Sequence, residues 1–332
     1  MAVDVKLFDD LDAVAADAGD LLDRARQPCL FDRLDWFRLV QAHGPGCRVC
    51  VLRATDAGGS AWLFLAREGR TARPLANWYT LRWGIVTSDA PGRDVQHRLL
   101  EGLRRSAPRL ARLDLHPIDH AGGLAPLLGR HGWHVSLAET SRRWRVDIDR
   151  GFEQYWAQRP GALRSTFRRK SKAARLDTTI LDRFDRGAWS AYERVYAGSW
   201  KGAEGSPAFL RALAEQEGAA GTLRLGLAFK NGEPVAAQMW LVENGVATIH
   251  KLAYTEAARP MSPGTILSEA MFRHVIDIDR VRVVDFGLGD DDYKADWMER
   301  SEPVFSVTAL DLRHPAGWSA GMAALVRRIR KL

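Results

Sequence analysis

A short acidic turn near the C-terminal end of the chain carries the side chains best suited to chemistry. It reads DFGLGDDDYK over residues 285–294 and follows the strand-like run VRVV. Gly287 and Gly289 permit backbone conformations that bulkier residues block. The phenol of Tyr293, with a pKa of about 10, is a suitable proton donor to a departing thiolate of pKa about 8.5, and Lys294 places a cation beside it. The pattern is also typical of a solvated acidic turn with an exposed ion pair.

A second candidate precedes this turn, where Ser262-Pro263-Gly264-Thr265 separates a strand-like run from a helix-like run. A helix that begins right after a strand presents free backbone N–H groups, which readily hold a phosphate. Arg259 and Lys251 add positive charge from upstream. The same residues are equally typical of a helix start that binds nothing, with serine as the N-cap and proline in the first turn.

A third candidate is a run of cations at residues 163–175 that contains no acidic residue. Arg164, Arg168, Lys172 and Arg175 share one face of a predicted helix. A solvated face, a site for an anionic substrate or donor, and a nucleic-acid surface all fit this pattern, and substrate contact is expected at Arg168 and Lys172. The basic tail at residues 318–332 could touch a membrane peripherally, although packing on the first domain fits it better.

Length, charge and cysteine content limit the classes of protein to which this chain can belong. The chain has 332 residues, 46% of them hydrophobic, which suggests about two globular domains. Its formal charge of +7 favours anionic partners. We find no secretory signal and no apolar stretch of the roughly 18 residues that a membrane helix needs, so we expect a soluble, cytoplasmic protein. Three cysteines predict no disulfide framework, and we expect no metal. The usual hydrolase, P-loop and dinucleotide signatures are missing.

The elements that must position these residues occur in an order that repeats. The first half is predicted to run from a helix at 7–25 and a helix at 35–42 through a hairpin and a strand at 78–86 to a helix at 93–106. The second half has helices, then strands at 222–229, 234–242 and 247–254, joined by Asn-Gly turns that strongly indicate hairpins. The predicted fold class is α/β with mixed sheets, divided into domains 1–150 and 151–332.

A similar motif in both halves supports a duplication within the chain. Ala90-Pro91-Gly92 precedes a predicted helix in the first half, as Ser262-Pro263-Gly264 does in the second. Proline-glycine is also common at any helix start or turn. The first half has no counterpart of the acidic glycine turn. If the halves are related, the first is expected to be a degenerate copy with a structural or substrate-binding role.

These motifs resemble those of CelD-like, cellulose-biosynthesis-type acyltransferases with the GNAT fold, which are related to the Fem-type aminoacyl transferases. The resemblance rests chiefly on the two C-terminal motifs. The other matching segments are the basic helix, Ser199-Trp200 with Gly205, and the strand around His250-Lys251. It implies tandem GNAT-like domains, with acetyl-CoA or another acyl-CoA between two splayed strands and its pyrophosphate over residues 259–265. It also implies that Lys294 polarises a carbonyl or contacts the donor and that Trp200 walls the acceptor pocket.

The implied activity is transfer of an acyl group to an amine on a small molecule or glycan precursor, in polysaccharide or cell-envelope biosynthesis. Lys294 or backbone N–H groups would stabilise the oxyanion, and Tyr293 would protonate the thiolate. His250 and Asp290 are the candidate bases, although a strand histidine is more often simply packed. Two alternatives stay open: a transferase that uses aminoacyl-tRNA, and a non-catalytic partner of a polysaccharide assembly system.

Overall fold

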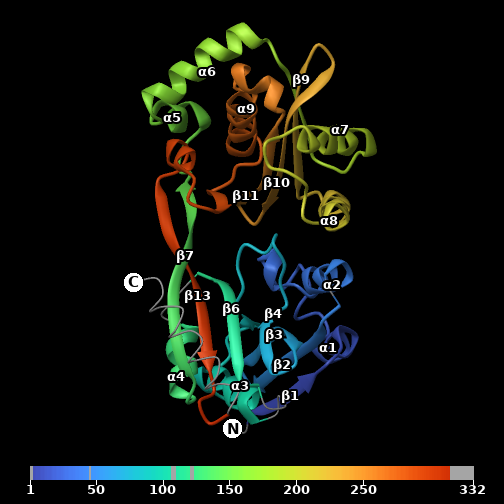
Figure 1. The fold of residues 1–332 in the computed structure, drawn as a ribbon, viewed down its shortest axis with the longest axis vertical. Helices are drawn as coiled ribbons and strands as arrows, with labels where there is room; N and C mark the ends of the chain where they lie inside the picture. The colour runs from blue at the N-terminus through green and yellow to red at the C-terminus, as the bar shows by residue number, and fades with distance from the viewer. Residues whose placement is uncertain (1–2, 45, 106–109, 120–122, 315–332) are drawn as a thin grey trace. The chain divides into compact units, whose positions relative to one another are not determined.

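The computed structural model describes residues 3–44, 46–105, 110–119 and 123–314 (Figure 1). The chain forms two compact units, Met1–Ser141 with Pro303–Leu332 and Arg142–Glu302. Strands β7 (His134–Asp147) and β13 (Arg300–Leu310) carry the chain from one unit to the other. The predicted C-terminal helix at 318–332 lies outside the described residues.

Unit 1 is a sheet with helices, in the sheet order β1-β2-β3-β4-β6-β13 and with β5 paired to β3. Its remaining elements are β1 (Asp4–Phe8), α1 (Leu11–Ala18), η1 (Leu30–Asp32), α2 (Leu34–His43), β2 (Arg48–Asp56), β3 (Gly59–Glu68), β4 (Thr71–Pro74), β5 (Val86–Thr87), α3 (Arg93–Arg105), β6 (Arg112–Ile118) and α4 (Leu124–Arg130). Its core includes the fully buried Trp36 and Trp62.

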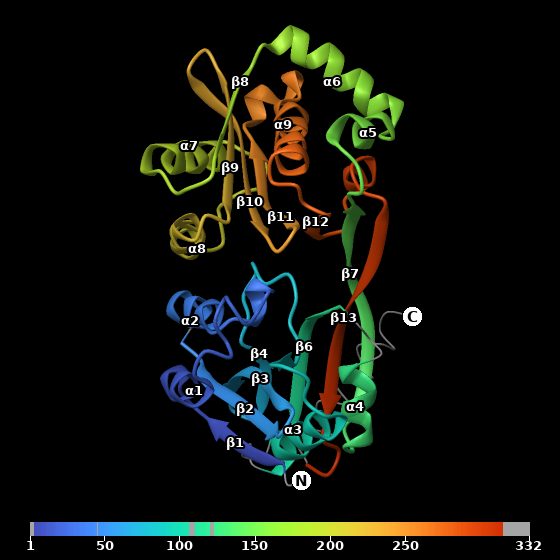
Figure 2. The ribbon, with the colours of Figure 1, turned by 180° about the vertical axis from the view of Figure 1, so that it is seen from behind.

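Unit 2 contains a sheet in the order β7-β12-β11-β10-β9-β8. Its elements are α5 (Phe152–Ala157), α6 (Gly161–Ala174), β8 (Asp177–Leu181), α7 (Arg186–Ala197), α8 (Pro207–Ala219), β9 (Leu223–Lys230), β10 (Glu233–Glu243), β11 (Val246–Tyr254), η2 (Glu256–Met261), α9 (Pro263–Asp277), β12 (Val283–Leu288) and η3 (Asp292–Asp296). Figure 2 shows α9 on one side of β9 to β11, with α7 and α8 on the other side.

Strand β10 is the centre of the unit 2 core because both of its faces are covered. Residues Ala236 to Trp240 each expose 1% or less of their surface. Trp240 meets Phe272 of α9 edge to face, with ring centroids 5.1 Å apart. Burial on both sides fixes the register of the strand, since a shift of one residue would exchange its two faces.

The predicted Asn-Gly hairpins are confirmed. Asn231 and Gly232 join β9 to β10 with φ values of 52° and 84°, and Asn244 and Gly245 join β10 to β11 with 53° and 78°. Positive φ at both central positions is the geometry of the tight turns whose twist matches that of the flanking strands.

Two predictions in the first half were wrong. The helix expected at 7–25 is preceded by β1, which pairs with β2, and the helix ends at Ala18 because Gly19 turns the chain with φ 58°. The strand expected at 78–86 is mostly an irregular segment. There the Asn77 side chain accepts the N–H of Tyr79, and Trp83 donates its indole N–H to the Phe64 carbonyl. These side-chain hydrogen bonds replace a strand ladder. Strand β8 was not predicted.

The α/β fold class with mixed sheets is confirmed, and both units repeat one arrangement. In unit 1, β4 and β6 pair in parallel at Thr71–Ala72 and Arg112–Leu113, with α3 between them in the sequence. In unit 2, β11 and β12 pair in parallel, with α9 between them. A parallel pair needs such a crossover, because a tight turn cannot return the chain to the same end of the sheet.

Candidate active site

Strands β11 and β12 run side by side for only a few residues and then part. Their parallel register joins Val246–Thr248 to Val283–Asp285. Strand β11 continues to Tyr254 against β10, whereas β12 continues to Leu288, which pairs with Arg143 of β7. Beyond the shared register these two described strands form no ladder with each other. Their facing backbone groups therefore remain available to a ligand.

Helix α9 begins shortly after the end of β11 and leaves N–H groups unused. Ser262 adopts a left-handed conformation with φ 53°, and its side chain makes no capping hydrogen bond. The N–H of Ile266 donates to the Ser262 carbonyl at 3.2 Å. Because Pro263 has no N–H, the orphan donors of the first turn belong to Gly264 and Thr265. These donors and the positive helix end suit an anion.

Gly264 allows a close approach between the start of α9 and the end of β11. A Cβ at this position would lie 3.0 Å from Cδ1 of Tyr254, which is tighter than nine in ten real Cβ contacts and would require the ring to shift by a few tenths of an ångström. The ring of Tyr254 in turn lies 4.3 Å, centroid to centroid, from the ring of Trp200. The glycine therefore sets the position of an aromatic pair as well as leaving the N–H groups accessible.

The loop that carries Trp200 is tied to the segment before α9. Ser199 forms a β-bridge with Thr255, and the N–H of Glu256 donates to the Gly198 carbonyl at 2.9 Å. Upstream of α9, Arg259 has an exposed side chain whose guanidinium lies 3.9 Å from the carboxylate of Glu256. The loop after α7 and the predicted phosphate loop are therefore neighbours within unit 2.

The turn after β12 is held by a buried carboxylate. Asp285 is 1% exposed and accepts hydrogen bonds from Arg143 Nε at 2.8 Å and Arg145 Nε at 2.9 Å. Its second oxygen accepts the N–H of Gly287 at 2.8 Å. Gly287 and Gly289 have φ values of 65° and 119°, conformations that L side chains rarely adopt. Asp285 thus positions the turn.

Lys294 is a buried clamp on the same turn. Its ammonium donates to the carbonyls of Leu288 at 2.7 Å and Gly289 at 3.3 Å, and it lies 3.4 Å from Oδ2 of Asp291. The residue is 3% exposed. Burial lowers the pKa of Lys294, while the charge of Asp291 opposes that shift. Since an ammonium has three donors, these contacts occupy Lys294 with the turn itself.

Unlike the buried Lys294, Tyr293 is open to solvent, with 44% of its surface exposed. Its ring meets Phe286 edge to face at 5.6 Å. Burial raises the pKa of Tyr293 above its ordinary value of 10, and the nearby Asp291 and Tyr254 raise it further. The phenol therefore stays protonated at neutral pH, as a proton donor must be.

Lys251 belongs to a nearly buried polar cluster. Its ammonium forms an ion pair with Glu204 at 2.9 Å, and the two side chains expose only 11% and 9% of their surface. The ammonium also lies over the ring of Tyr196, 5.1 Å from the centroid. Burial and the charge of Glu204 raise the pKa of Tyr196 to about 12. Lys251 is therefore already neutralised by the protein.

The two candidate bases differ in character. His250 is the extra residue of a β-bulge, because Met239 pairs with Lys251 and Trp240 pairs with Ile249. Burial lowers the pKa of His250 to about 3, with help from the Lys251 charge. His250 is thus neutral at pH 7 and only a weak proton acceptor. Asp290 is exposed on the turn after β12.

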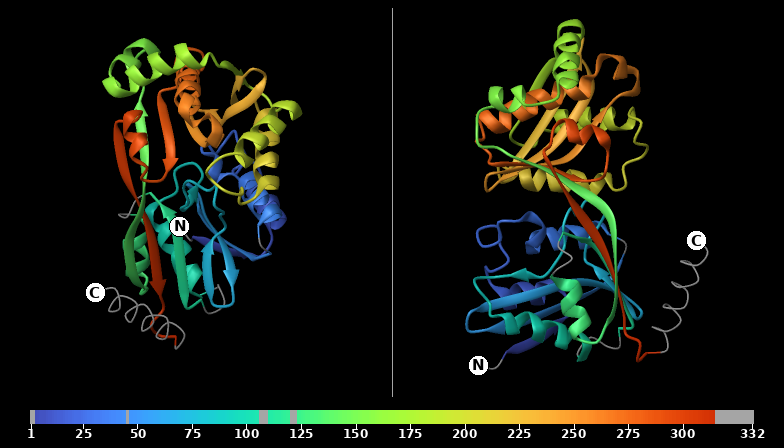
Figure 3. Two further views of the ribbon diagram at one scale, coloured as in Figure 1. Left: turned by 45° about the horizontal axis from the view of Figure 1, so that its top comes forward. Right: turned by 90° about the vertical axis from the view of Figure 1, so that its left-hand side faces the viewer.

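The basic helix α6 lies beside α9 and η2 (Figure 3). Lys170 donates its ammonium to the carbonyl of Pro260 at 2.7 Å. Arg168 and Lys172 are exposed on the same helix. The structure therefore brings a positively charged helix next to the predicted phosphate loop.

Glu204, Tyr196 and Lys201 were not identified from the sequence. Glu204 and Lys201 share the loop SWKGAEG with Trp200, which was noted only as part of a resemblance. The sequence did contain a signal, since this loop places a lysine and a glutamate within five residues of a tryptophan. The partner of that glutamate, Lys251, lies 47 residues away and could not be read from spacing.

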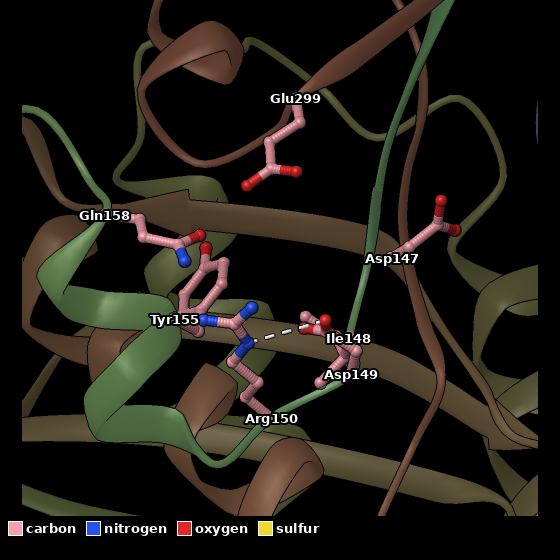
Figure 4. Close-up of a pocket in the computed structure, with 7 residues that line it drawn as sticks. All are labelled: Asp147, Ile148, Asp149, Arg150, Tyr155, Gln158 and Glu299. Carbon is pink, nitrogen blue, oxygen red and sulfur yellow. Dashed lines mark ion pairs between the residues drawn. The ribbon is translucent and has the colours of Figure 1, made fainter.

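A separate pocket of unit 2, with a volume of about 340 Å³, is shown in Figure 4. Its charged residues are mutually compensated. Asp149 lies 3.5 Å from Arg150, Asp147 accepts a bond from Arg300 at 2.9 Å, and Glu299 pairs with Arg159. We therefore assign no ligand to it. Within the described residues, no cluster of three potential metal-ligating side chains occurs, and no helix has the length and apolar character of a membrane span.

Known structures share this fold. The structure of FemX superposes with a TM-score of 0.64 at 11% identity, covering 92% of this chain and 97% of FemX. The C-terminal domain of a candidate lysylphosphatidylglycerol synthetase from Agrobacterium fabrum gives 0.60 at 14% identity, covering 96% and 97%. A tandem GNAT protein from the clavulanic acid biosynthesis pathway gives 0.52 at 14% identity, covering 92% and 98%. At such identities the likeness shows the fold alone.

The parting strands, the helix start behind them and the tandem arrangement define a GNAT-type acyltransferase fold. The model of the acetyltransferase (GNAT) domain family matches residues 130–295, half of the chain, and the chain belongs to that family. Comparison with curated protein sequences gives no match.

Proposed function

We propose that this protein transfers an acyl group from an acyl-CoA, such as acetyl-CoA, to an amine acceptor. The observation that carries the proposal is the divergence of β11 and β12 after Thr248 and Asp285, next to the uncapped start of α9. The first feature offers backbone groups to an extended acyl donor. The second offers N–H groups to its pyrophosphate.

The residues around α9 fit such a donor. Gly264 and Thr265 would hold phosphate oxygens through their N–H groups, and the exposed Arg259 would add charge from the preceding segment. A side chain at 264 would press on the ring of Tyr254. Lys251 contributes to the electrostatic field and not as a direct ligand, because Glu204 already occupies it.

The transfer step has three requirements. The acceptor nitrogen attacks the thioester carbonyl and forms the amide bond while the carbon–sulfur bond breaks. Backbone N–H groups on the parted edge of β11 would stabilise the oxyanion, and Tyr293 would give its proton to the departing thiolate. Asp290 would accept the proton of the amine through water, a role that its exposure permits. Lys294 would act indirectly by fixing the turn that carries Tyr293.

Calorimetry tests the donor. Wild-type protein is titrated with acetyl-CoA and longer acyl-CoAs, alongside Gly264→Glu, which places a negative charge at the proposed phosphate site. Gly161→Glu is the matched control, because it adds the same charge at a position with open space around it. We expect binding by wild type and by the control, and at least a tenfold loss in Gly264→Glu. Absence of binding of every acyl-CoA to wild type would refute the proposal.

A second candidate is transfer from aminoacyl-tRNA, which is favoured by the exposed cations of α6 beside the donor loop. FemX and the synthetase domain share the fold of this chain, which makes the same alternative worth testing. The test measures aminoacyl-tRNA binding across salt concentrations for wild type and for a variant with Arg168→Gln and Lys172→Gln. Loss of phosphate contacts should reduce the slope of log affinity against log salt by about 2. An unchanged slope would exclude α6 as the contact.

The CelD-like relationship, and with it a role in polysaccharide or cell-envelope biosynthesis, is a further proposal that rests on the sequence motifs. A non-catalytic role in such a system makes a distinct prediction. Suppose that Tyr293→Phe left the cellular phenotype intact, while a variant that no longer binds acyl-CoA abolished it. The chain would then be a donor sensor and not a transferase.

A further inference from the structure

A glutamine side chain is buried beneath the first turn of α9. Gln238 lies on β10 and is only 1% exposed. It alternates along the strand with Ala236 and Trp240, so the three side chains share the face of the sheet that α9 covers (Figure 2). An amide in such apolar surroundings costs free energy unless its polar atoms find partners. The partners of Gln238 therefore indicate what the amide contributes.

The indole of Trp240 fixes the orientation of this amide. Its Nε1 donates to Oε1 of Gln238 at 2.8 Å. An indole N–H can only donate, so the oxygen of the amide faces Trp240 and the NH2 group faces α9. The indole is itself held in place, because Trp240 is fully buried and packs edge to face on Phe272. The amide of Gln238 therefore has a single orientation.

The NH2 group of Gln238 contacts the start of α9 at two points. Nε2 donates to Oγ of Ser268 at 2.8 Å and to the carbonyl of Gly264 at 3.4 Å. A carbonyl oxygen has two lone pairs, so Gly264 can accept this bond in addition to its helical one. Gly264 also adjoins the ring of Tyr254. Two contacts thus locate the peptide that follows Pro263.

The contact with Gly264 extends to the N–H groups proposed for the pyrophosphate. The carbonyl of Gly264 and the N–H of Thr265 belong to one planar peptide unit. A bond that fixes the carbonyl therefore also fixes the direction of that N–H, which has no partner within α9. The hydrogen bonds run from the Trp240 indole through the Gln238 amide to this peptide unit, and every donor points the same way.

We propose that Gln238 is a positioning residue for the acyl donor: it directs the Thr265 N–H and, together with Trp240, polarises that N–H toward the pyrophosphate. This inference rests on the proposed acyl transfer, because it assigns a role at the same donor site. Aligned amides strengthen one another's hydrogen bonds, so an anion on Thr265 should tighten the 3.4 Å contact. A purely structural role would not need an amide, since apolar side chains of the same shape fill the core without a desolvation cost.

Nuclear magnetic resonance tests the positioning in the absence of any donor. Threonine is labelled with 15N, and the amide resonance of Thr265 is assigned by its loss in Thr265→Ser. Gln238→Met keeps the length of the side chain and removes its amide. We expect the Thr265 amide proton to move upfield in this variant, because its N–H is less polarised. Trp240→Phe removes the donor that orients Gln238 and should move the resonance in the same direction.

The matched control is Gln216→Met, the same substitution in α8 of unit 2. Nε2 of Gln216 donates to Glu217 at 3.2 Å, so this variant also loses an amide hydrogen bond. It should leave the Thr265 resonance where it is in wild type. If Gln238→Met does not fold, Trp240→Phe still tests the connection, because it retains Gln238 and changes only what orients it.

Binding and kinetics separate positioning from a general loss of stability. Acetyl-CoA and inorganic pyrophosphate are titrated into each variant by calorimetry. We expect Gln238→Met to bind both about tenfold more weakly and Gln216→Met to bind them as wild type does. The KM for acetyl-CoA should rise about tenfold with kcat nearly constant, because the thioester lies at the far end of the donor. Trp240→Phe should weaken binding about threefold by itself and have no further effect in Gln238→Met.

Three results would overturn the proposal: a Thr265 resonance that stays in place in both Gln238→Met and Trp240→Phe, equal affinity of wild type and Gln238→Met for the two ligands, or independent effects of the two substitutions. A wild type that binds neither pyrophosphate nor any acyl-CoA would refute the transferase. The Thr265 resonance would still decide whether Gln238 controls that N–H, because its measurement contains no donor.

Discussion

Replacement of Lys294 tests whether this residue acts on the substrate or on the turn. In Lys294→Met the apolar stem is kept, while the ammonium and its contact with the ring of Phe286, 5.4 Å from the centroid, are lost. The carbonyls of Leu288 and Gly289 lose their donor in a site that is almost closed to solvent. A hydrogen bond to a charged group contributes about 1.5–3 kcal/mol. We therefore expect the free energy of unfolding to fall by about 3 kcal/mol.

The assay combines urea unfolding with hydrogen exchange of residues 286–294. The variant should lower the urea midpoint and speed exchange across the turn. The matched control is Lys230→Met, which also removes a lysine-to-carbonyl hydrogen bond in unit 2 but at a partly exposed position, and it should cost less than 1 kcal/mol.

An acyl-transfer assay distinguishes a role of Lys294 in positioning the turn from a direct role on the substrate. If Lys294 positions the turn, activity should fall in parallel with the loss of protection in the turn, and stabilising co-solvents such as sucrose should restore part of it. A variant with unchanged unfolding and exchange but with abolished acyl transfer would refute the reasoning. In that case the ammonium would act on the substrate directly.

Three further predictions follow from individual contacts. The folded pKa of His250 is about 3, below its ordinary value of 6.5, so folding is disfavoured by protonation and stability should fall as the pH drops below 6.5. The unfolding free energy of His250→Leu relative to wild type should therefore improve by about 1.4 kcal/mol per pH unit between pH 6 and 4, and a constant difference would contradict the burial of this imidazole. Asp285→Asn should cost about 3–5 kcal/mol, measured by urea unfolding, because it removes the negative partner of the buried Arg143; a loss under 1 kcal/mol would show that the pair is not buried in solution. Tyr293→Phe should lower kcat by about a hundredfold or more with little change in acyl-CoA affinity, and an equal kcat would show that Tyr293 is not the proton donor.

The sequence alone determined the elements whose signals are local. The Asn-Gly turns located the β9 to β11 hairpins, because positive φ at both central positions depends only on the residues there. Periodicity located helices such as α3 and α9 to within two residues. The α/β class followed from the order of these elements. Local signals failed at 78–86, where hydrogen bonds from side chains displaced the strand.

Only the tertiary structure decided which charged groups are paired within the protein and which are open to a ligand. Lys251, Lys294 and Lys201 look alike in the sequence, but the first pairs with Glu204 and the second clamps the turn after β12. The partner of Lys251 lies 47 residues away, so spacing carries no trace of it. The partners of Lys294 lie within its own turn, and only the folded structure shows that its ammonium is buried against them. The parting of β11 and β12 is likewise set by the pairing of β12 with β7 and not by either strand. Residue types therefore indicate the chemistry available to this chain, while long-range contacts decide which atoms are left to perform it.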